Sequence, residues 1–313
     1  MQVLRSFQDV PASAKHGAMT IGNFDGVHLG HQTVIAAVRR LADALPGPAV
    51  AMLFDPHPRQ YFQPGTPQFT LTPQSERLTL LADLGLDFTV VLPFDAGLAA
   101  LPAEAFIEVV LVAGFAVRRV VIGYDFSFGR GRSGNGELLM AAGQRHGFTV
   151  SVEAAAADGT GAYSSSRIRE LLRLGNVAGA ASLLGRWWRI NGDVIAGAGR
   201  GAGLGFPTAN ITLRPGIELA HGIYASWVWI DGARHPAASY LGSRPTFDNG
   251  QPVFETFLLD YDGDLYGRSV SIDFVDFLRP DRAFPDPIAL ATQMHADCAE
   301  VMRRLAAVND RRC

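Results

Sequence analysis

Hydrophobic and polar positions follow two different periods along the first half of the chain. Short apolar or β-branched runs predict buried strands at residues 18–21, 50–54, 88–92, 119–123 and 149–152. Apolar residues at helical spacing predict helices at 33–40, 72–85, 102–113 and 136–146, and the segment 163–169 opens a further helix that runs through residue 173. Such alternation of strands and helices predicts an α/β doubly wound parallel sheet, whose ligands bind at the carboxyl ends of its strands.

The pattern changes after residue 186. Short strands at close spacing are predicted at 188–191, 208–213, 224–230, 254–259 and 270–274. Asp262 and Gly263 predict a hairpin turn between the last two of these strands, and helical spacing predicts a closing helix at 285–308. We therefore expect a small antiparallel β-barrel domain with a C-terminal helix, at residues 185–313, after a nucleotidyltransferase-like domain at residues 1–184.

Length, charge and cysteine content narrow the class of protein. A chain of 313 residues, 48% of them hydrophobic, supports two cores. The net charge of −3 provides no positive field for nucleic acid or an anionic membrane, and the apolar run 109–117 is about half a bilayer span. Cys298 and Cys313 form no disulfide framework. We expect a cytoplasmic protein without nucleic-acid or membrane partners.

A nucleotide phosphate site is predicted where the first strand gives way to a helix. Residues 21–32 read I-G-N-F-D-G-V-H-L-G-H-Q, which places His28 and His31 at a helix N-terminus. Backbone N–H groups there lack intrahelical partners, and the helix dipole favours anions. Glycines that let the backbone approach a ligand closely lie at Gly22, Gly26 and Gly30.

Two other roles for the histidine pair are weaker. A zinc site would need a further protein ligand, but His57, His146 and His221 follow no recurrent ligand spacing. Two ordinary surface histidines would not need a glycine-rich entry loop.

A second anion site is predicted at the start of the helix near residue 165. Ser164, Ser165 and Ser166 precede Arg169 in the run S-S-S-R-I-R. One serine is explained by helix capping alone. Three serines with an arginine one turn later also suit a triphosphate that the histidine pair holds from the other side.

Two glycine-rich segments match the sequence of a dinucleotide-binding turn but do not lie directly between a strand and a helix, as such a turn requires. Residues 129–134 match G-x-G-x-x-G, but five residues separate them from the end of the preceding strand. Residues 197–202 match a looser form, and Pro207 forbids an uninterrupted helix after them. No G-x-x-x-x-G-K-[ST] segment is present, which excludes a P-loop enzyme.

The second half carries a candidate phosphoryl-transfer site. Residues 205–210 read G-F-P-T-A-N, and strand alternation puts Thr208 and Asn210 on the same side, where their oxygens suit one Mg²⁺ ion. Glu255 lies within an otherwise apolar strand. It is either a solvent-facing residue or a general base that takes a proton from an attacking alcohol.

These segments together resemble one family over the whole chain. They are G-N-F-D-G-V-H-L-G-H-Q, F-D-P-H-P-R, G-Y-D-F-S-F-G-R-G-R-S-G, S-S-S-R-I-R, G-F-P-T-A-N-I, G-S-R-P-T-F and D-G-D-L-Y-G. In this order they are similar to the bacterial bifunctional riboflavin kinase and FMN adenylyltransferase, or FAD synthetase. The resemblance implies that the barrel converts riboflavin to FMN with Mg-ATP, and that the first domain converts FMN and ATP to FAD and pyrophosphate.

The resemblance also implies a role for each matching residue. The catalytic residues would be His28, His31, Arg169 and Glu255, and the Mg²⁺ ligands Thr208 and Asn210. ATP and its phosphates would bind at Gly22, Asn23, Phe24, Gly26, Gly30, Ser164, Ser165, Ser166, Gly205 and Pro207. The flavin would bind at Asp55, His57, Asp125, Phe126 and Arg132.

The chain departs from the family pattern in the kinase half. Ala198, Ala202 and Gly203 replace an acidic residue, Arg and Thr, while Tyr240 replaces Asn and Phe257 replaces His. These changes spare the proposed base and Mg²⁺ ligands, so we expect a working kinase with weakened nucleotide binding. The alternatives are an adenylyltransferase whose barrel is a flavin-binding regulatory module, and a flavin-binding protein without catalysis.

Overall fold

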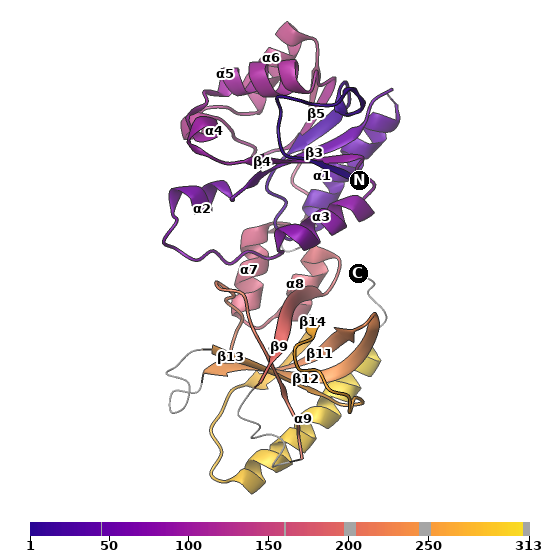
Figure 1. Cartoon of the computed structure of the whole chain (residues 1–313), viewed down its shortest axis with the longest axis vertical. Helices are drawn as coiled ribbons and strands as arrows, with labels where there is room; N and C mark the ends of the chain where they lie inside the picture. Colours follow the sequence, from indigo (N-terminus) through magenta and orange to yellow (C-terminus); the bar gives the residue numbers. More distant parts are fainter. Residues whose placement is uncertain (45, 160, 197–204, 244–251, 309–313) are drawn as a thin grey trace. The chain divides into compact units, whose positions relative to one another are not determined.

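The computed structural model describes residues 1–44, 46–159, 161–196, 205–243 and 252–308. The chain forms two compact units (Figure 1). The first unit comprises Met1–Gln68 and Thr72–Ser164, and the second comprises Phe69–Leu71 and Ser165–Cys313. Among the described helices, none is both long and apolar enough to cross a membrane.

A six-stranded parallel sheet forms the centre of the first unit. Its order is β1-β4-β3-β2-β5-β6. The strands are β1 (Gln2–Leu4), β2 (Ala18–Ile21), β3 (Ala49–Asp55), β4 (Phe88–Pro93), β5 (Arg119–Gly123) and β6 (Thr149–Glu153). Strands β3 and β4 follow β2 on one side of it in the sheet, whereas β5 and β6 lie on the other side of β2. The switch point of the sheet therefore lies between β2 and β5, where ligands bind in such folds.

Helices cover both faces of this sheet, as the alternation of strands and helices predicts (Figure 1). The helical segments are α1 (Leu29–Asp43), α2 (Pro58–Phe62), α3 (Gln74–Asp83), α4 (Ala96–Ala100), α5 (Ala103–Phe106), the π-helix Ile107–Gly114 and α6 (Gly136–His146). Along β3, Val50 and Met52 pack with α5 and α6, while Ala51 and Leu53 pack with α1 and α3. The prediction of a doubly wound sheet is confirmed.

The second unit contains a closed six-stranded barrel in the order β10-β13-β12-β11-β14-β9, with antiparallel pairing throughout. Its strands are β9 (Trp188–Ile195), β10 (Ala209–Ile211), β11 (Gly222–Ile230), β12 (Ala233–Ser243), β13 (Pro252–Leu258) and β14 (Ser269–Pro280). The predicted barrel is confirmed, although the sequence did not indicate β12. The predicted hairpin at Asp262 and Gly263 is wrong, because β13 and β14 are not neighbours in the barrel.

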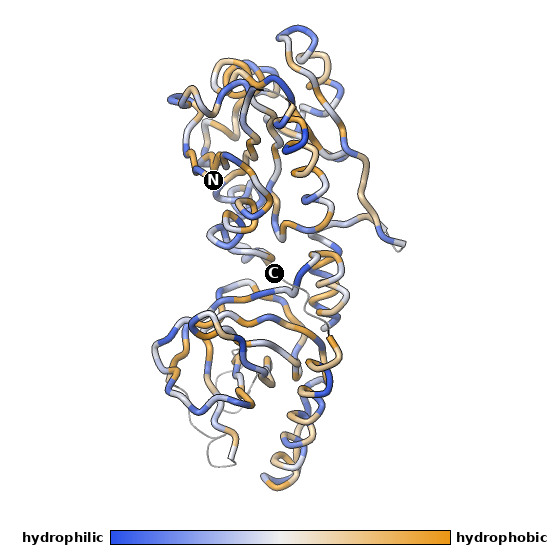
Figure 2. The backbone as a smooth tube through the Cα atoms, turned by 90° about the vertical axis from the view of Figure 1, so that its right-hand side faces the viewer, coloured by the Kyte–Doolittle hydropathy of each residue, from blue (hydrophilic) through white to orange (hydrophobic). Residues whose placement is uncertain are grey.

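Three helices belong to the second unit: α7 (Ser165–Arg173), α8 (Val177–Leu184) and α9 (Pro287–Ala307). Helix α9 confirms the predicted closing helix, and hydrophobic and hydrophilic residues are interspersed along it (Figure 2). Its residues Val301 and Leu305 share a buried cluster with Ala181 of α8 and with Ala225 and Val275 of the barrel.

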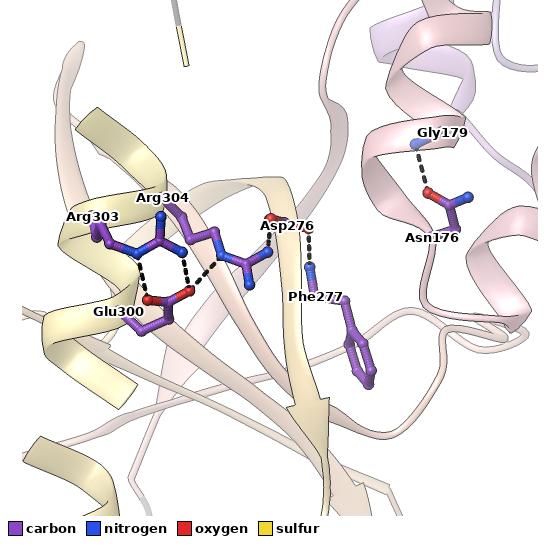
Figure 3. Close-up of polar contacts among 7 residues, drawn as sticks. All are labelled: Asn176, Gly179, Asp276, Phe277, Glu300, Arg303 and Arg304. Carbon is purple, nitrogen blue, oxygen red and sulfur yellow. Dashed lines mark hydrogen bonds and ion pairs between the residues drawn. The ribbon is translucent and has the colours of Figure 1, made fainter. Parts of the chain in front are cut away.

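A charged network borders this cluster (Figure 3). Glu300 accepts hydrogen bonds from Arg303 and Arg304 on the same helix, and Arg304 also contacts Asp276 of β14. On α8, the side chain of Asn176 accepts a hydrogen bond from the Gly179 N–H and so caps the helix. Each of these side chains is about one third exposed or more, so solvent screens the ion pairs, and burial of the apolar cluster holds α9 on the barrel more than its charges do.

The short segment Phe69–Leu71 is held within the second unit. Trp188 Nε1 donates to the Leu71 carbonyl at 3.0 Å, and the ring of Phe69 lies edge-on to Trp188. Arg214 donates to the Thr70 carbonyl at 2.6 Å, and Arg169 Nε donates to the Phe69 carbonyl at 2.5 Å. A segment far from the barrel in sequence is therefore part of its packing.

The residue at which the second domain begins stays a proposal, and truncation of the chain tests it. The sequence predicts that residues 185–313 fold alone. A cut before residue 185, however, removes α7 and α8, and Ala181 of α8 packs in one cluster with Trp187 and Val275. We expect residues 165–313 to unfold at a higher temperature than residues 185–313, because the cut at 185 exposes apolar surface. Fluorescence reports this unit, since all four tryptophans lie at 187, 188, 227 and 229. Equal melting temperatures would contradict the prediction.

Candidate active sites

The histidine pair lies at the carboxyl end of β2, beside the switch point of the sheet. His28 is the N-cap of α1, and its Nδ1 accepts a hydrogen bond from the His31 N–H at 3.3 Å. The two rings stack with their centroids 3.6 Å apart and their planes 18° apart. The predicted placement at a helix N-terminus is thus observed, and both rings lie at the end of the helix where the first N–H groups have no backbone carbonyl within the helix to bind.

The loop before His28 has an unusual backbone. Phe24 and Val27 have positive φ angles of 49° and 44°, and Gly26 has one of 86°. Such angles are rare for a β-branched residue like Val27 and persist only where surrounding contacts impose them. A Cβ atom at Gly30, two residues after His28, would lie 3.2 Å from the His28 ring, so a residue without a side chain suits this position.

The surroundings of His31 favour its uncharged form. Burial lowers the pKa of His31 well below its ordinary value, and the charges of His28 and Arg77 lower it further. Its Nδ1 atom is buried. At neutral pH the His31 ring is therefore an uncharged imidazole that donates a single N–H.

This pKa shift predicts that the first unit loses stability in acid. The unfolded chain protonates His31 near its ordinary pKa of about 6.5, whereas the folded chain resists protonation there. Below about pH 6.5 the unfolded state binds more protons, so the free energy of unfolding falls as pH falls. Hydrogen exchange of α1 peptides at pH 7.5 and 5.5 measures the loss. We expect His31→Asn to lose less stability than wild type between these two pH values. Equal losses in the two proteins would contradict the prediction.

A pocket of about 330 Å³ lies at the carboxyl ends of β3, β4 and β5. Its lining is rich in phenylalanine and includes Phe54, Phe62, Phe94, Phe106, Phe126 and Phe128. The rings of Phe126 and Phe128 stack at 5.3 Å, and those of Phe54 and Phe62 lie edge-on to Phe94. Aromatic walls of this kind suit a flat, extended ring system.

The structure places the predicted flavin residues in and around this pocket. Phe126 and Arg132 line it. Asp55 and His57 adjoin the lining residues Phe54 and Pro58, and Asp125 is exposed next to Phe126. The sequence analysis did not single out Phe62, Phe94 and Phe128; the signal available was an aromatic residue in the segment after each of three consecutive strands.

The serine run opens α7 at Ser165, and Arg169 follows one turn later. Ser164 closes the first unit, whereas Ser165, Ser166 and Arg169 belong to the second. The predicted convergence of Arg169 with the histidine pair joins residues of different units and stays a prediction.

In the barrel, the candidate base and a candidate Mg²⁺ ligand lie side by side. Asn210 of β10 and Glu255 of β13 are directly opposite each other in register. Residues so paired have Cβ atoms about 4.5–5.5 Å apart. Thr208 precedes the first residue of β10, so the strand is shorter than predicted. Gly205 has a φ of 84°, and Pro207 is exposed.

The chemistry of this set fits Mg²⁺. Thr208 and Asn210 offer a hydroxyl and an amide oxygen, the hard donors that this ion prefers. Within the described residues there is no cluster of three or more His, Cys, Asp or Glu side chains able to hold a metal ion. A Mg²⁺ ion here would therefore depend on substrate phosphates and water for its remaining ligands.

Two of the residues that depart from the family pattern, Tyr240 and Phe257, lie on barrel strands and make side-chain contacts there. The Tyr240 hydroxyl donates to Asp281 at 2.9 Å, and Tyr240 lies opposite Glu255 on β12. The Phe257 ring lies edge-on to Phe206 at 5.2 Å. The other departures, Ala198, Ala202 and Gly203, lie outside the described residues.

A doubly wound domain with an H-x-G-H loop, followed by a closed antiparallel barrel, defines a nucleotidyltransferase-like protein with a second, β-barrel domain. Comparison with known proteins agrees with both halves. Residues 10–167 match the FAD synthetase family model, and residues 184–305 match the riboflavin kinase family model.

Proteins named bifunctional riboflavin kinase/FMN adenylyltransferase resemble the chain along nearly its whole length. The one from Haemophilus influenzae is 36% identical and covers 95% of this chain and 97% of its own, and the one from Pseudomonas fluorescens is 37% identical and covers 98% of each. The Escherichia coli protein is 34% identical over 95% of this chain and 96% of its own. The chain belongs to the bifunctional riboflavin kinase/FMN adenylyltransferase family. The function predicted from the sequence is thereby confirmed over the adenylyltransferase-only alternative.

One solved structure shows the same fold over the whole chain. A crystal structure from Streptococcus pneumoniae, described as a macrolide-efflux protein, has a TM-score of 0.87 and 29% identity. It covers 96% of this chain and 98% of its own. That description applies to the Streptococcus pneumoniae protein.

Proposed function

We propose that the chain makes FMN and then FAD, using ATP in both steps. The barrel transfers the γ-phosphoryl group of ATP to riboflavin, and the first unit transfers AMP from a second ATP to FMN with release of pyrophosphate. The observation that carries the second step is the position of the histidine pair and the aromatic pocket at the same edge of one parallel sheet. The family supports both steps.

In the first unit, we propose that FMN lies in the aromatic pocket and ATP phosphates meet His28 and His31. The phosphate of FMN is already ionised at neutral pH, so its attack on the α-phosphorus needs no general base. The site instead positions the two substrates and stabilises charge that develops on the phosphate oxygens. An uncharged donor such as His31, fixed at a helix N-terminus, suits that task.

In the barrel, we propose that Glu255 takes the proton from the terminal ribityl hydroxyl of riboflavin as it attacks the γ-phosphorus. Asn210, opposite Glu255, and Thr208 would hold Mg²⁺. The ion would offset charge on the transferred phosphoryl group. The products are FMN and ADP.

One assay of the purified chain tests the whole proposal. Riboflavin and Mg-ATP are supplied, and riboflavin, FMN and FAD are separated over time. We expect FMN to appear first and FAD to follow. FAD formation only from added FMN would support the regulatory-barrel alternative, and flavin binding without ATP consumption would support a binding protein.

We also propose that the enzyme works in the cytoplasm on small molecules, without nucleic-acid or membrane partners. The net charge of −3 and the presence of only two cysteines support this location.

A further inference from the structure

A buried arginine on α3 lies behind the histidine loop. Only 7% of the Arg77 surface is exposed, and its Nη1 donates to the Asn23 carbonyl at 2.6 Å. Its Nε is buried without a hydrogen-bond partner within the described part of the chain. Burying a guanidinium costs free energy, so a residue kept in such a place calls for an explanation.

A second contact joins residues 72–77 to the loop before His28. Two residues beyond Asn23, the Asp25 carboxylate accepts a hydrogen bond from the Thr72 N–H at 3.1 Å. Both Asp25 and Thr72 are buried. Residues 72–77 therefore hold the loop at two points.

The loop held in this way is the one that carries the positive φ angles at Phe24 and Val27. Such a backbone relaxes unless its neighbours fix it. His28 follows Val27 directly, and the side chain of Gln32 donates to the Val27 carbonyl at 2.9 Å from the other side. Contacts from Arg77, Thr72 and Gln32 thus fix the backbone that leads into His28.

Charge links Arg77 to the same histidines. Burial lowers the pKa of Arg77, and the carboxylates of Asp25 and Asp55 offset part of this effect. The groups that act on His31 are His28 at the start of α1 and Arg77 on α3, and both lower the pKa of His31. The Phe24 ring, edge-on to His31 at 5.2 Å, carries no charge.

We propose that Arg77 is a positioning residue of the adenylyltransferase site, which acts through the Asn23 carbonyl to hold the loop that presents His28 and His31. The proposal rests on the function proposed for the first unit. Arg77 itself does not touch the reacting atoms. It fixes the backbone from α3 and keeps a permanent positive charge beside the histidine pair.

The test compares Arg77→Gln with Arg77→Lys in the full-length protein. Both variants lose the guanidinium fork, so kcat for FAD formation from FMN and ATP should fall roughly ten- to a hundredfold, with KM for FMN nearly unchanged. Only Arg77→Gln also loses the charge. Because the pKa of His31 then rises, the acid limb of its pH–rate profile should move to higher pH, while that of Arg77→Lys stays in place.

A direct titration separates this role from simple loss of structure. The His31 ring signal in ¹³C-histidine-labelled protein, assigned with His31→Asn, should titrate at higher pH in Arg77→Gln than in wild type. Arg145→Gln is the matched control, since Arg145 is exposed on α6 and pairs only with Glu104 among the contacts described for it. That control should leave kcat, the acid limb and the titration unchanged.

The outcomes are distinct. Wild-type protein that makes no FAD would overturn the proposed function itself. If the wild type is active, two results for Arg77→Gln would overturn the role of Arg77. One is a kcat equal to that of wild type. The other is a lower kcat with no shift in either the acid limb of the pH–rate profile or the His31 titration. If Arg77→Gln does not fold, an Arg77→Lys variant with wild-type kcat would overturn it as well.

Discussion

Replacing His28 with alanine should slow FAD formation by roughly a hundredfold or more and leave FMN formation at its wild-type rate. The His28 ring stacks on His31 at the start of α1, where a phosphate would meet both rings and the helix N-terminus. FMN formation should survive, because the candidate kinase residues lie on the barrel strands of the other unit. Separate assays with riboflavin and with FMN as the flavin measure the two rates.

His28 also caps α1, and loss of a cap costs about 1 kcal/mol of stability. His28→Asn separates the two roles, because asparagine is a good cap but has no imidazole. We expect this variant to lose as much FAD formation as His28→Ala. Recovery of activity in His28→Asn would show that the ring serves the helix and not the phosphate. A comparable loss of both activities in a folded variant would contradict the assignment of two separate sites.

Local signals explain what the sequence predicts correctly. The strands β2 to β5 are mainly apolar runs, and β6 alternates valine with polar residues; neither pattern depends on distant residues. The start of α1 is marked by glycines and a capping side chain within ten residues of β2. The histidine loop could therefore be placed at a strand-to-helix junction from the sequence alone.

Non-local pairing explains what the sequence does not predict. Strand β12 reads A-R-H-P-A-A-S-Y-L-G-S, and its proline and alanines weaken any strand signal although it pairs with both β11 and β13. The turn at Asp262 and Gly263 reads as a hairpin, yet the closure of the barrel places β14 between β11 and β9. Strand order in a barrel is a property of the whole sheet, which a short turn motif does not contain.

In the candidate sites too, the sequence indicates some residues and leaves their contacts with distant residues unpredicted. The sequence predicts Asn210 and Glu255 as members of one site, and only the register of β10 and β13 shows that they are directly opposite. Arg77 looks like an ordinary polar position of an amphipathic helix. Its burial against the Asn23 carbonyl depends on how α3 packs, which no local pattern contains.

Glu255→Gln should lower kcat for FMN formation by roughly two to four orders of magnitude, the effect of removing a general base. Glutamine has nearly the shape of glutamate and keeps one carbonyl oxygen, so the pairing of β13 with β10 and β12 should persist. The amide cannot accept the ribityl proton, and the loss should therefore appear in kcat more than in KM for riboflavin. Adenylylation of added FMN should stay at the wild-type rate.

Glu218→Gln is the matched control for this variant. Glu218 lies in the same unit and is exposed, and its described contact is an ion pair with Arg173 at 2.6 Å. An exposed pair of this kind contributes little to stability, so FMN formation should not change. Wild-type FMN formation by Glu255→Gln would remove Glu255 from the mechanism. If the wild-type protein makes FAD from FMN but no FMN at saturating Mg-ATP, the barrel would instead be a module that binds flavin without phosphorylating it.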